Sequence, residues 1–468
     1  MRAAMATPAP PAFVHDLETC VGCHACVIAC ANENGLHDGR LWRQIVTYNP
    51  ARHPAEPAYH LSLACNHCLE APCLRHCPAL AIARDPRTGA VLIDEARCMG
   101  CRYCSWVCPF DAPRFDGAQG VMTKCTLCNG RLAMGLQPAC TSLCPTGALR
   151  LNGHERSDGV GLAAFPRTDA RPAIAFLPLR HHAVALRAAG GAPLGVTRAP
   201  APPALPSKVT LRSEWSLAAF TFVAIVLVAW VLAWALGGPR PQPWVLVGLG
   251  GAAMTVSAAH LGRPGRAWRA MLNWRGSWLS REVLAYGGFL ALATLAVLSG
   301  GPPWGRWVAA LAGLGCLVCV DQVYAAMARE DATRWDRATA LLSGLFLGGL
   351  FARAPAVFLP AGLARLAGFL ARAQAQPSQR NRQRWWLAAT RLATGAASVP
   401  LALGSDPSAS ATILLALLAE SLDRCDFYQR VDIVTPAGTA QRALDAALRH
   451  GGTALPHGAA TTASAAQP

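Results

Sequence analysis

The sequence from residue 98 to residue 113 reads CMGCRYCSWVCPFDAP, and it decides the fold of the first part of the chain. Its cysteines follow the order Cys-x2-Cys-x2-Cys-x3-Cys-Pro, a run typical of proteins that hold iron-sulfur clusters. Three thiolates two residues apart lie on a tight loop that can wrap three corners of an Fe4S4 cube. The fourth, Cys108, leads into Pro109, is turned away from that cube and reaches a neighbouring one. The run therefore predicts clusters held in pairs.

Three further groups of four cysteines repeat this pattern. They lie in residues 20–30 (CVGCHACVIAC), 65–78 (CNHCLEAPCLRHCP) and 124–149 (KCTLCNGRLAMGLQPACTSLCPTGAL). A zinc ribbon needs two Cys-x2-Cys pairs and has no use for a third cysteine and a Cys-Pro, so four cubane clusters are the better interpretation. One or two clusters would suffice to staple a small fold, whereas four indicate an electron-transfer chain. The interleaved histidines, His24, His67 and His76, are expected beside the clusters or on the surface and not among the ligands.

The composition divides the chain into two different parts. The 468 residues are 53% hydrophobic and only 15% charged, against roughly 25% charged in soluble proteins. Sixteen of the 19 cysteines lie between Cys20 and Cys144. Residues 1–150 carry 13 basic and 11 acidic side chains, so most of the net charge of +16 belongs to the apolar remainder. Basic residues between apolar runs fix orientation in a lipid bilayer, which argues against a nucleic-acid partner.

The apolar part predicts an all-α membrane domain over residues 208–430. Lengths of about 20 apolar residues give the following spans: 215–236, 244–261, 283–299, 307–328, 338–354, 355–372, 386–403 and 409–427. By hydropathy alone, 355–372 could instead be an interfacial helix, but the arginine-rich loops fall on one side only if it crosses. We therefore expect eight spans in the inner membrane, with both termini and the iron-sulfur domain on the cytoplasmic face. A Pro/Ala/Gly-rich linker is expected at 151–207 and a disordered tail at 431–468.

This topology places several ionisable side chains near the membrane face that bears the clusters. His260 and Glu282 lie at that face, and span ends bring further polar groups there: Asp321, Tyr324, Glu420, Asp423 and Asp426. Ionisable groups in a membrane are costly and suggest function. A quinone exchanges electrons together with protons, so it needs a titratable group within reach. The alternatives are pairing of Glu282 with Arg281 and of the other acids with arginines. No haem is expected, because His260 is the only membrane histidine and a bis-His haem needs two.

The cysteine motifs at 65–78, 98–113 and 124–149 resemble the iron-sulfur subunit of the dimethyl sulfoxide reductase family of molybdenum oxidoreductases, over residues 12–150. The resemblance implies an α+β domain of tandem bacterial-ferredoxin type over residues 1–150, in which the outer groups pair and the inner groups pair. It implies these ligand sets: Cys20, Cys23, Cys26 and Cys144 (cluster 1); Cys65, Cys68, Cys73 and Cys108 (cluster 2); Cys98, Cys101, Cys104 and Cys77 (cluster 3); Cys125, Cys128, Cys140 and Cys30 (cluster 4). Nitrate-reductase relatives have a tryptophan where this chain has Cys101, so all four clusters are expected to be [4Fe-4S].

The apolar part resembles the membrane anchor subunit of the same family. The similar stretches are SEWSLAAFTF (213–222), HLGRPGRAWRAMLNWRGSWLSRE (260–282) and AESLDRCDFYQR (419–430). The second implies that His260 and Glu282 exchange protons with menaquinol or ubiquinol. The chain thus resembles a fusion of both subunits, with the substrate chemistry on a separate molybdopterin-containing catalytic subunit. Two alternatives stay open: a complex that oxidises sulfite or another sulfur compound and reduces quinone, and a membrane-tethered iron-sulfur redox sensor.

Overall fold

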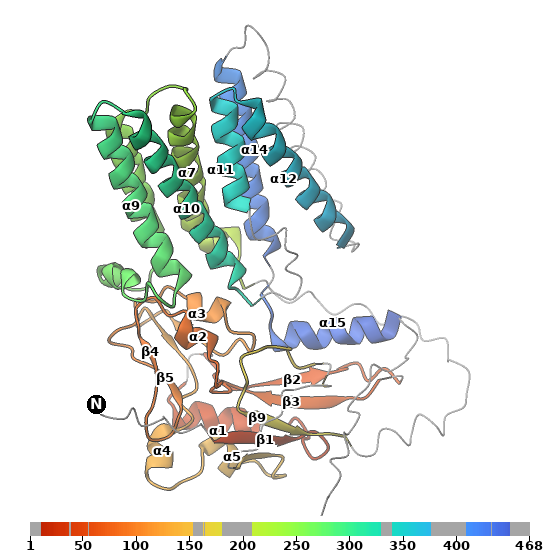
Figure 1. The fold of residues 1–468 in the computed structure, drawn as a ribbon. Coiled ribbons are helices and arrows are strands. Elements are labelled where there is room, and N and C mark those ends of the chain that lie inside the picture. The colour runs from red at the N-terminus through yellow and green to blue at the C-terminus, as the bar shows by residue number, and fades with distance from the viewer. Residues whose placement is uncertain are drawn as a thin grey trace, which may run out of the picture. The chain divides into compact units, whose positions relative to one another are not determined.

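The chain forms two compact units in a computed structural model (Figure 1). The structure describes residues 11–36, 39–54, 56–152, 162, 164–179, 208–328, 339–375, 409–431 and 433–449. The first unit consists of Met1–Arg75, Leu80–Pro206 and Val434–Pro468, and the second of His76–Ala79 and Ser207–Ile433. The chain therefore leaves the first unit, builds the second, and returns to the first.

The first unit is an assembly of short strands and short helices. Its strands are β1 (Ala12–Asp16), β2 (Gln44–Tyr48), β3 (Tyr59–Leu63), β4 (Ile82–Arg84), β5 (Val91–Ile93), β6 (Arg114–Asp116), β7 (Val121–Thr123), β8 (Leu149–Asn152) and β9 (Ile174–Leu177). Its helices are α1 (Ala25–Glu33), α2 (Pro72–Arg75), α3 (Tyr103–Trp106), α4 (Asn129–Ala133), α5 (Ala139–Ser142) and α15 (Pro436–Arg449). Most of these elements are too short to build a core alone, so the cysteine-bearing loops between them form much of the interior.

A three-stranded sheet anchors the first unit, with β1 in its centre. All five residues of β1 are buried, because β8 pairs with it antiparallel on one side and β9 pairs with it parallel on the other. The remaining strands form three antiparallel hairpins, β2–β3, β4–β5 and β6–β7. Helix α15 packs on the β2–β3 hairpin (Figure 1).

Two expectations about the first unit need correction. The stretch 151–207 is not a linker throughout, because β9 belongs to the central sheet; the pair His181–His182 lies outside the described residues. The tail 431–468 is not disordered throughout, because Pro436–Arg449 form α15. The apolar side chains of α15 recur at helical spacing, and Ala440, Leu444 and Ala447 are buried.

The second unit is helical. Its helices are α7 (Leu211–Ala235), α8 (Pro243–Ala258), the 3-10 helix η1 (Pro264–Met271), α9 (Trp278–Leu298), α10 (Pro303–Ala325), α11 (Thr339–Phe351), α12 (Pro355–Ala375) and α14 (Ala409–Arg430). Helix α7 starts with a capping box in which Thr210 and Ser213 bond each other's backbone N–H groups. It contacts α8, α10, α11 and α14, so it lies at the centre of the bundle.

Small residues allow close approach of the helices around α7. A side-chain carbon on Gly313 of α10 would lie 3.0 Å from Phe289 and Val228, and one on Gly348 of α11 would lie 2.7 Å from Leu232. Contacts of this kind suit helices in lipid, where packing and not water exclusion holds helices together.

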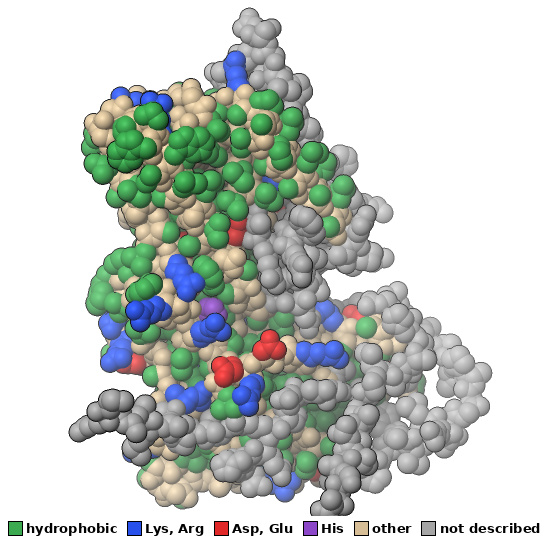
Figure 2. All heavy atoms as spheres, in the orientation of Figure 1, with side chains coloured by type: hydrophobic (Ala, Val, Ile, Leu, Met, Phe, Trp, Pro, Cys, Tyr) green, Lys and Arg blue, Asp and Glu red, His purple; other side chains and the backbone are tan. Residues whose placement is uncertain are grey.

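Among the described residues, three helices are long and apolar enough to cross a membrane: α7, α9 and α10. Helices α8 and α11 and the first part of α12 are shorter apolar helices. On the face shown in Figure 2, apolar side chains cover most of these helices. Leu295, Leu298 and Leu311 are among their exposed apolar side chains. Seven of the eight expected spans coincide with helices in the described part of the chain. The expected span 386–403 lies outside the described residues. The count of eight therefore stays a prediction.

Candidate functional site

The four cysteine groups share one loop conformation. The residue before the second cysteine has a left-handed backbone in every group: Gly22 (φ 66°), His67 (42°), Gly100 (71°) and Leu127 (60°). This conformation costs energy for residues other than glycine. Its recurrence at His67 and Leu127 indicates that the loop, and not local preference, dictates the backbone.

The same left-handed residue donates its N–H to the first cysteine of its group. The N–H groups of His67, Gly100 and Leu127 lie 3.5, 3.4 and 3.4 Å from the Sγ atoms two residues earlier, and Gly22 bonds Cys20 in the same way. Backbone N–H···S bonds of this kind tune the reduction potential of bound iron-sulfur clusters. The Cys-x2-Cys spacing thus builds the same loop conformation four times.

The fold brings the first group to the fourth and the second to the third. Helices α1 and α5 carry cysteines of the outer groups and pack together, and α2 and α3 do the same for the inner groups. Individual sulfur atoms follow this arrangement. Cys20 lies within electrostatic range of Cys23, Cys26 and Cys144. Cys68 neighbours Cys65, Cys73 and Cys108, while Cys30 neighbours Cys128 and Cys140.

A buried histidine nitrogen without a hydrogen-bond acceptor among the described residues of this unit fits a bound iron-sulfur cluster. Val91 N–H donates to Nδ1 of His67 at 3.0 Å, while burial lowers the pKa of His67 well below its usual value. The neutral ring therefore carries its proton on Nε2, which is buried and finds no acceptor among the described residues. A cluster sulfur would supply that acceptor.

Two of the cysteine thiols are strongly affected by burial. Burial raises the pKa of Cys30 and of Cys73 to about 12. Such thiols give up their protons when they bind metal. In the described part of the chain, no three His, Cys, Asp or Glu side chains converge on a single metal ion. The ligands of a cube bind separate iron atoms, so they stand further apart than ligands of one ion.

Comparison with known proteins identifies both parts of the chain. Residues 57–154 match the model of a 4Fe-4S dicluster domain, and residues 242–299 match that of the DMSO reductase anchor subunit. The B component of sulfite dehydrogenase from Allochromatium vinosum is 35% identical over 200 residues, which cover 36% of this chain and 83% of that protein. The B component of anaerobic dimethyl sulfoxide reductase from Haemophilus influenzae is 37% identical, over 29% of this chain and 71% of its own length. This chain therefore belongs to the iron-sulfur subunit family of the dimethyl sulfoxide reductases. The thiosulfate reductase electron transfer subunit of Salmonella typhi is also similar, with 38% identity over 31% of this chain and 77% of that protein.

The iron-sulfur subunit family explains the first unit, and the anchor match explains the helices that follow it. The expected fusion of an iron-sulfur subunit with a membrane anchor is therefore confirmed. The chain is an electron-transfer and anchor component of the kind found in reductases of dimethyl sulfoxide or thiosulfate and in sulfite dehydrogenase.

The anchor match includes the segment that joins α8 to α9. His260 follows α8 and is half-buried, with its Nδ1 against the carbonyl of Ser257. Glu282 lies in the first turns of α9 and is buried. No hydrogen bond or ion pair joins these two side chains in the described structure. Within this second unit, Asn273 donates its Nδ2 to the carbonyl of Cys77 at 2.9 Å.

Glu282 is not part of an ion pair with its neighbour. Arg281 donates instead to the carbonyls of Trp274 (2.9 Å) and Arg275 (2.7 Å). Among the described residues, the Glu282 carboxyl has neither a cationic partner nor a hydrogen-bond donor. Cys316, Cys319 and Tyr324 of α10 lie within electrostatic range of it. Burial without a partner distinguishes Glu282 from the other membrane acids.

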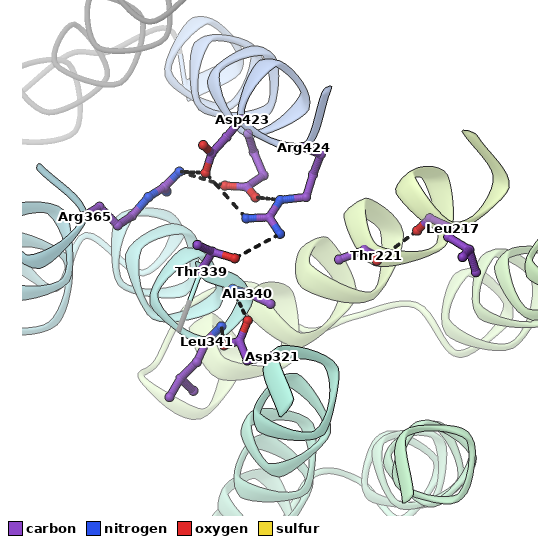
Figure 3. A network of polar contacts seen from close by, with 10 residues as sticks. Leu217, Thr221, Asp321, Thr339, Ala340, Leu341, Arg365, Asp423 and Arg424 are labelled. Carbon is purple, nitrogen blue, oxygen red and sulfur yellow. Dashed lines mark hydrogen bonds and ion pairs between the residues drawn. The ribbon is translucent and has the colours of Figure 1, made fainter. Parts of the chain in front are cut away.

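Two of the other acids, Glu420 and Asp423, form a network of ion pairs with arginines (Figure 3). Glu420 lies 3.0 Å from both Arg365 and Arg424, and Asp423 lies 3.1 Å from Arg365 and 3.5 Å from Arg424. The expected pairing of these acids with arginines is confirmed. Asp321 differs, because its two oxygens accept the N–H groups of Ala340 (2.8 Å) and Leu341 (3.0 Å) in the first turn of α11.

Proposed function

We propose that this chain passes electrons between a membrane quinone and a separate molybdopterin-containing catalytic subunit through four [4Fe-4S] clusters. The observation that carries the proposal is the joining of a matched 4Fe-4S dicluster domain and a matched anchor domain in one chain. Four ligand loops of one conformation support the number of clusters. Each bound cluster supplies one-electron redox chemistry, and the protein holds it, shields it from water and sets its potential.

The proposed ligand sets follow the pairing of the outer and of the inner groups. They are Cys20, Cys23, Cys26 and Cys144; Cys65, Cys68, Cys73 and Cys108; Cys98, Cys101, Cys104 and Cys77; and Cys125, Cys128, Cys140 and Cys30. The contact of α1 with α5 and that of α2 with α3 support this crossed arrangement.

Substitution of single cysteines tests the crossed sets. We expect Cys144→Ser to alter the same electron paramagnetic resonance signal as Cys23→Ser, although the two residues are 121 positions apart. Cys30→Ser should instead alter the signal that Cys128→Ser alters. The wild-type chain should bind about 16 irons, four for each cube. Cys316→Ser serves as the control and should leave iron content unchanged. If Cys30→Ser alters the signal of Cys23→Ser, each group holds its own cluster and the sets are wrong.

We propose that His260 and Glu282 exchange protons with the quinone, menaquinol or ubiquinol, and that no haem takes part. The position of Glu282 supports this role. Its side chain is buried, and no partner among the described residues fixes the protonation state of its carboxyl.

A second candidate is electron flow in the opposite direction. The similarity to the B component of sulfite dehydrogenase favours it, since that match covers 83% of the relative. Membranes that contain the whole complex separate the two directions. Reduction of the clusters by sulfite, followed by reoxidation with a quinone analogue, would establish the second candidate. Reduction by quinol and reoxidation by a sulfoxide or thiosulfate would support the first.

The return of the chain to the first unit supports an even number of membrane crossings. Apart from His76–Ala79, residues up to Pro206 and from Val434 onward belong to the same unit. Helices that start and end on one side of a bilayer would give this division. Seven of the expected spans coincide with described helices, so an even number requires one more crossing, and the expected span at 386–403 would supply it. We therefore propose eight spans, with the first unit on the cytoplasmic face.

Reporter fusions test this topology. A reporter joined after Pro468 should be active only in the cytoplasm, because α15 and the first unit share a side. A matched reporter inserted after Gly238, in the loop between α7 and α8, should be active only outside the cytoplasm. Activity of both reporters on the same side would contradict eight spans, and a reversed pair would show that the first unit is exported.

A further inference from the structure

Two basic side chains are almost completely buried in the first unit. Arg43 is 2% exposed and Lys124 is 3% exposed. A buried charge is strongly unfavourable unless an opposite charge lies beside it. No ion pair between described residues involves either side chain, so no carboxylate of the described residues compensates them. The compensating negative charge must come from another source.

Arg43 lies where the sets proposed for clusters 1 and 4 meet. Its Nη1 donates to the carbonyl of Ser62 at 3.1 Å and to the hydroxyl of Ser62 at 3.0 Å. Its Nε and Nη2 are buried and have no acceptor among the described residues. The sulfur atoms within its electrostatic range belong to the two sets: Cys26 of the first and Cys30, Cys125 and Cys140 of the fourth.

Ser62 connects Arg43 to cluster 1. Its hydroxyl oxygen lies 3.2 Å from Sγ of Cys26. When Cys26 is a thiolate ligand it has no proton to give, so Ser62 must be the donor. Arg43 holds the Ser62 oxygen as acceptor and so orients the hydroxyl proton toward the sulfur.

Lys124 lies where the sets proposed for clusters 4 and 2 meet. Its ammonium contacts the carbonyls of Val91 and, at 3.3 Å, Cys125. It also hydrogen-bonds Cys65, and Cys73 and Cys125 lie within its electrostatic range. Lys124 thus faces sulfur atoms of two clusters at once.

We propose that Arg43 and Lys124 are the residues that set the reduction potentials of three clusters, Arg43 acting on clusters 1 and 4 and Lys124 on clusters 4 and 2. The inference rests on the ligand sets of the proposed function. Reduction adds one negative charge to a cube, and a fixed cation a few ångströms away in a dry interior stabilises that charge. Cluster 4 lies beside both cations, whereas clusters 1 and 2 each lie beside one. The two charges therefore favour an electron on cluster 4 over an electron on cluster 1 or cluster 2.

Neutral substitutions and redox titrations test the proposal. Arg43→Met should lower the potentials of clusters 1 and 4, and Lys124→Met those of clusters 4 and 2, with the reduction equilibrium of each falling at least tenfold, about 59 mV for a one-electron couple. Cluster 3 should titrate as in the wild type in both variants. The measurement is electron paramagnetic resonance of membranes that hold the whole complex, with signals assigned by the cysteine variants above. These reduction potentials are measured at equilibrium, so they do not depend on catalytic turnover by the complex.

Matched variants separate charge from packing. Arg43→Lys and Lys124→Arg keep the charge and should keep the potentials. Arg131 lies in α4, directly after the ligand-bearing segment of Cys128, but its side chain is 26% exposed and pairs with Glu33 at 3.1 Å. Water screens such a charge, so Arg131→Gln should change no potential. If a methionine variant loses iron, Ser62→Ala is titrated in its place. Loss of the Ser62 hydroxyl should lower the reduction potential of cluster 1 alone.

Two failures can be told apart. Variants that retain all their iron and titrate like the wild type would overturn the role of the buried cations. A wild-type chain with fewer than four clusters, or one whose clusters do not exchange electrons with quinone, would overturn the proposed function instead.

Discussion

Glu282→Gln is expected to abolish exchange between the clusters and quinone while all four clusters stay in place. Glutamine has the size and hydrogen-bonding atoms of glutamate but cannot take up or release a proton. A positioned acid or base contributes about 10²- to 10⁴-fold to proton-coupled steps, so the rate of cluster reduction by quinol should fall at least hundredfold. Rapid mixing of reduced quinone analogue with oxidised membranes, followed by the cluster absorbance, measures this rate.

Two companion variants sharpen this experiment. Glu282→Asp keeps the carboxyl and should recover part of the rate. Arg281→Gln removes the neighbour whose guanidinium bonds the carbonyls of Trp274 and Arg275, and it should reduce the rate much less than Glu282→Gln does. If Arg281→Gln and Glu282→Gln slow the reaction equally, the segment before α9 matters only for its shape. Unchanged kinetics in Glu282→Gln would remove Glu282 from the quinone site.

The cysteine spacing predicted the ligand loops because their geometry is local. The two residues between one cysteine and the next fix where the backbone must turn, and the positive φ angles of His67 and Leu127 follow from that turn. The pairing of the groups is not local. It depends on packing of α1 against α5, more than 100 residues apart in the sequence, and only the family resemblance suggested it beforehand.

The sequence did not predict two elements that form only by packing on a distant part of the same chain. Strand β9 has four residues and gains its hydrogen bonds from β1, more than 150 residues earlier. Helix α15 buries mainly alanine and leucine, whose spacing over 14 residues gives a weak signal against the Ala-rich sequence around it. A clearer indication that Lys124 is important was present in the sequence, but the many basic residues of the chain obscured it. It is one of two lysines in a chain with 42 basic residues, and it directly precedes a ligand cysteine.

Sequence also could not separate the acid that has no partner from those that have one. All the membrane acids were expected near one face, but their partners come from distant positions. Arg365 is 55 residues from Glu420 and reaches it only because α12 and α14 lie close together. Glu420 and Asp423 pair with arginines and Asp321 accepts backbone N–H groups, whereas the Glu282 carboxyl has no such partner among the described residues.

Arg424→Met is expected to destabilise the second unit by about 3–5 kcal/mol, the range found when one partner of a buried ion pair is removed. Glu420 is fully buried, and Arg424 is 3% exposed. Arg365 and Arg424 together balance the charges of Glu420 and Asp423 (Figure 3). Methionine fills a similar volume but leaves two carboxylates to one guanidinium. Equilibrium unfolding in mixed micelles, followed by tryptophan fluorescence, gives the free energy of unfolding.

A charge-balanced double variant tests whether the lost energy is electrostatic. Arg424→Met combined with Glu420→Gln leaves Arg365 opposite Asp423 at 3.1 Å, so the charges again cancel. Removal of both partners of a buried pair costs far less than removal of one. We therefore expect the double variant to regain most of the stability that Arg424→Met loses. If the double variant is as unstable as Arg424→Met, the loss comes from packing around Thr339 and Phe427 and not from an uncompensated carboxylate. In either case its clusters should react with quinone as in the wild type, because Glu282 lies outside this network.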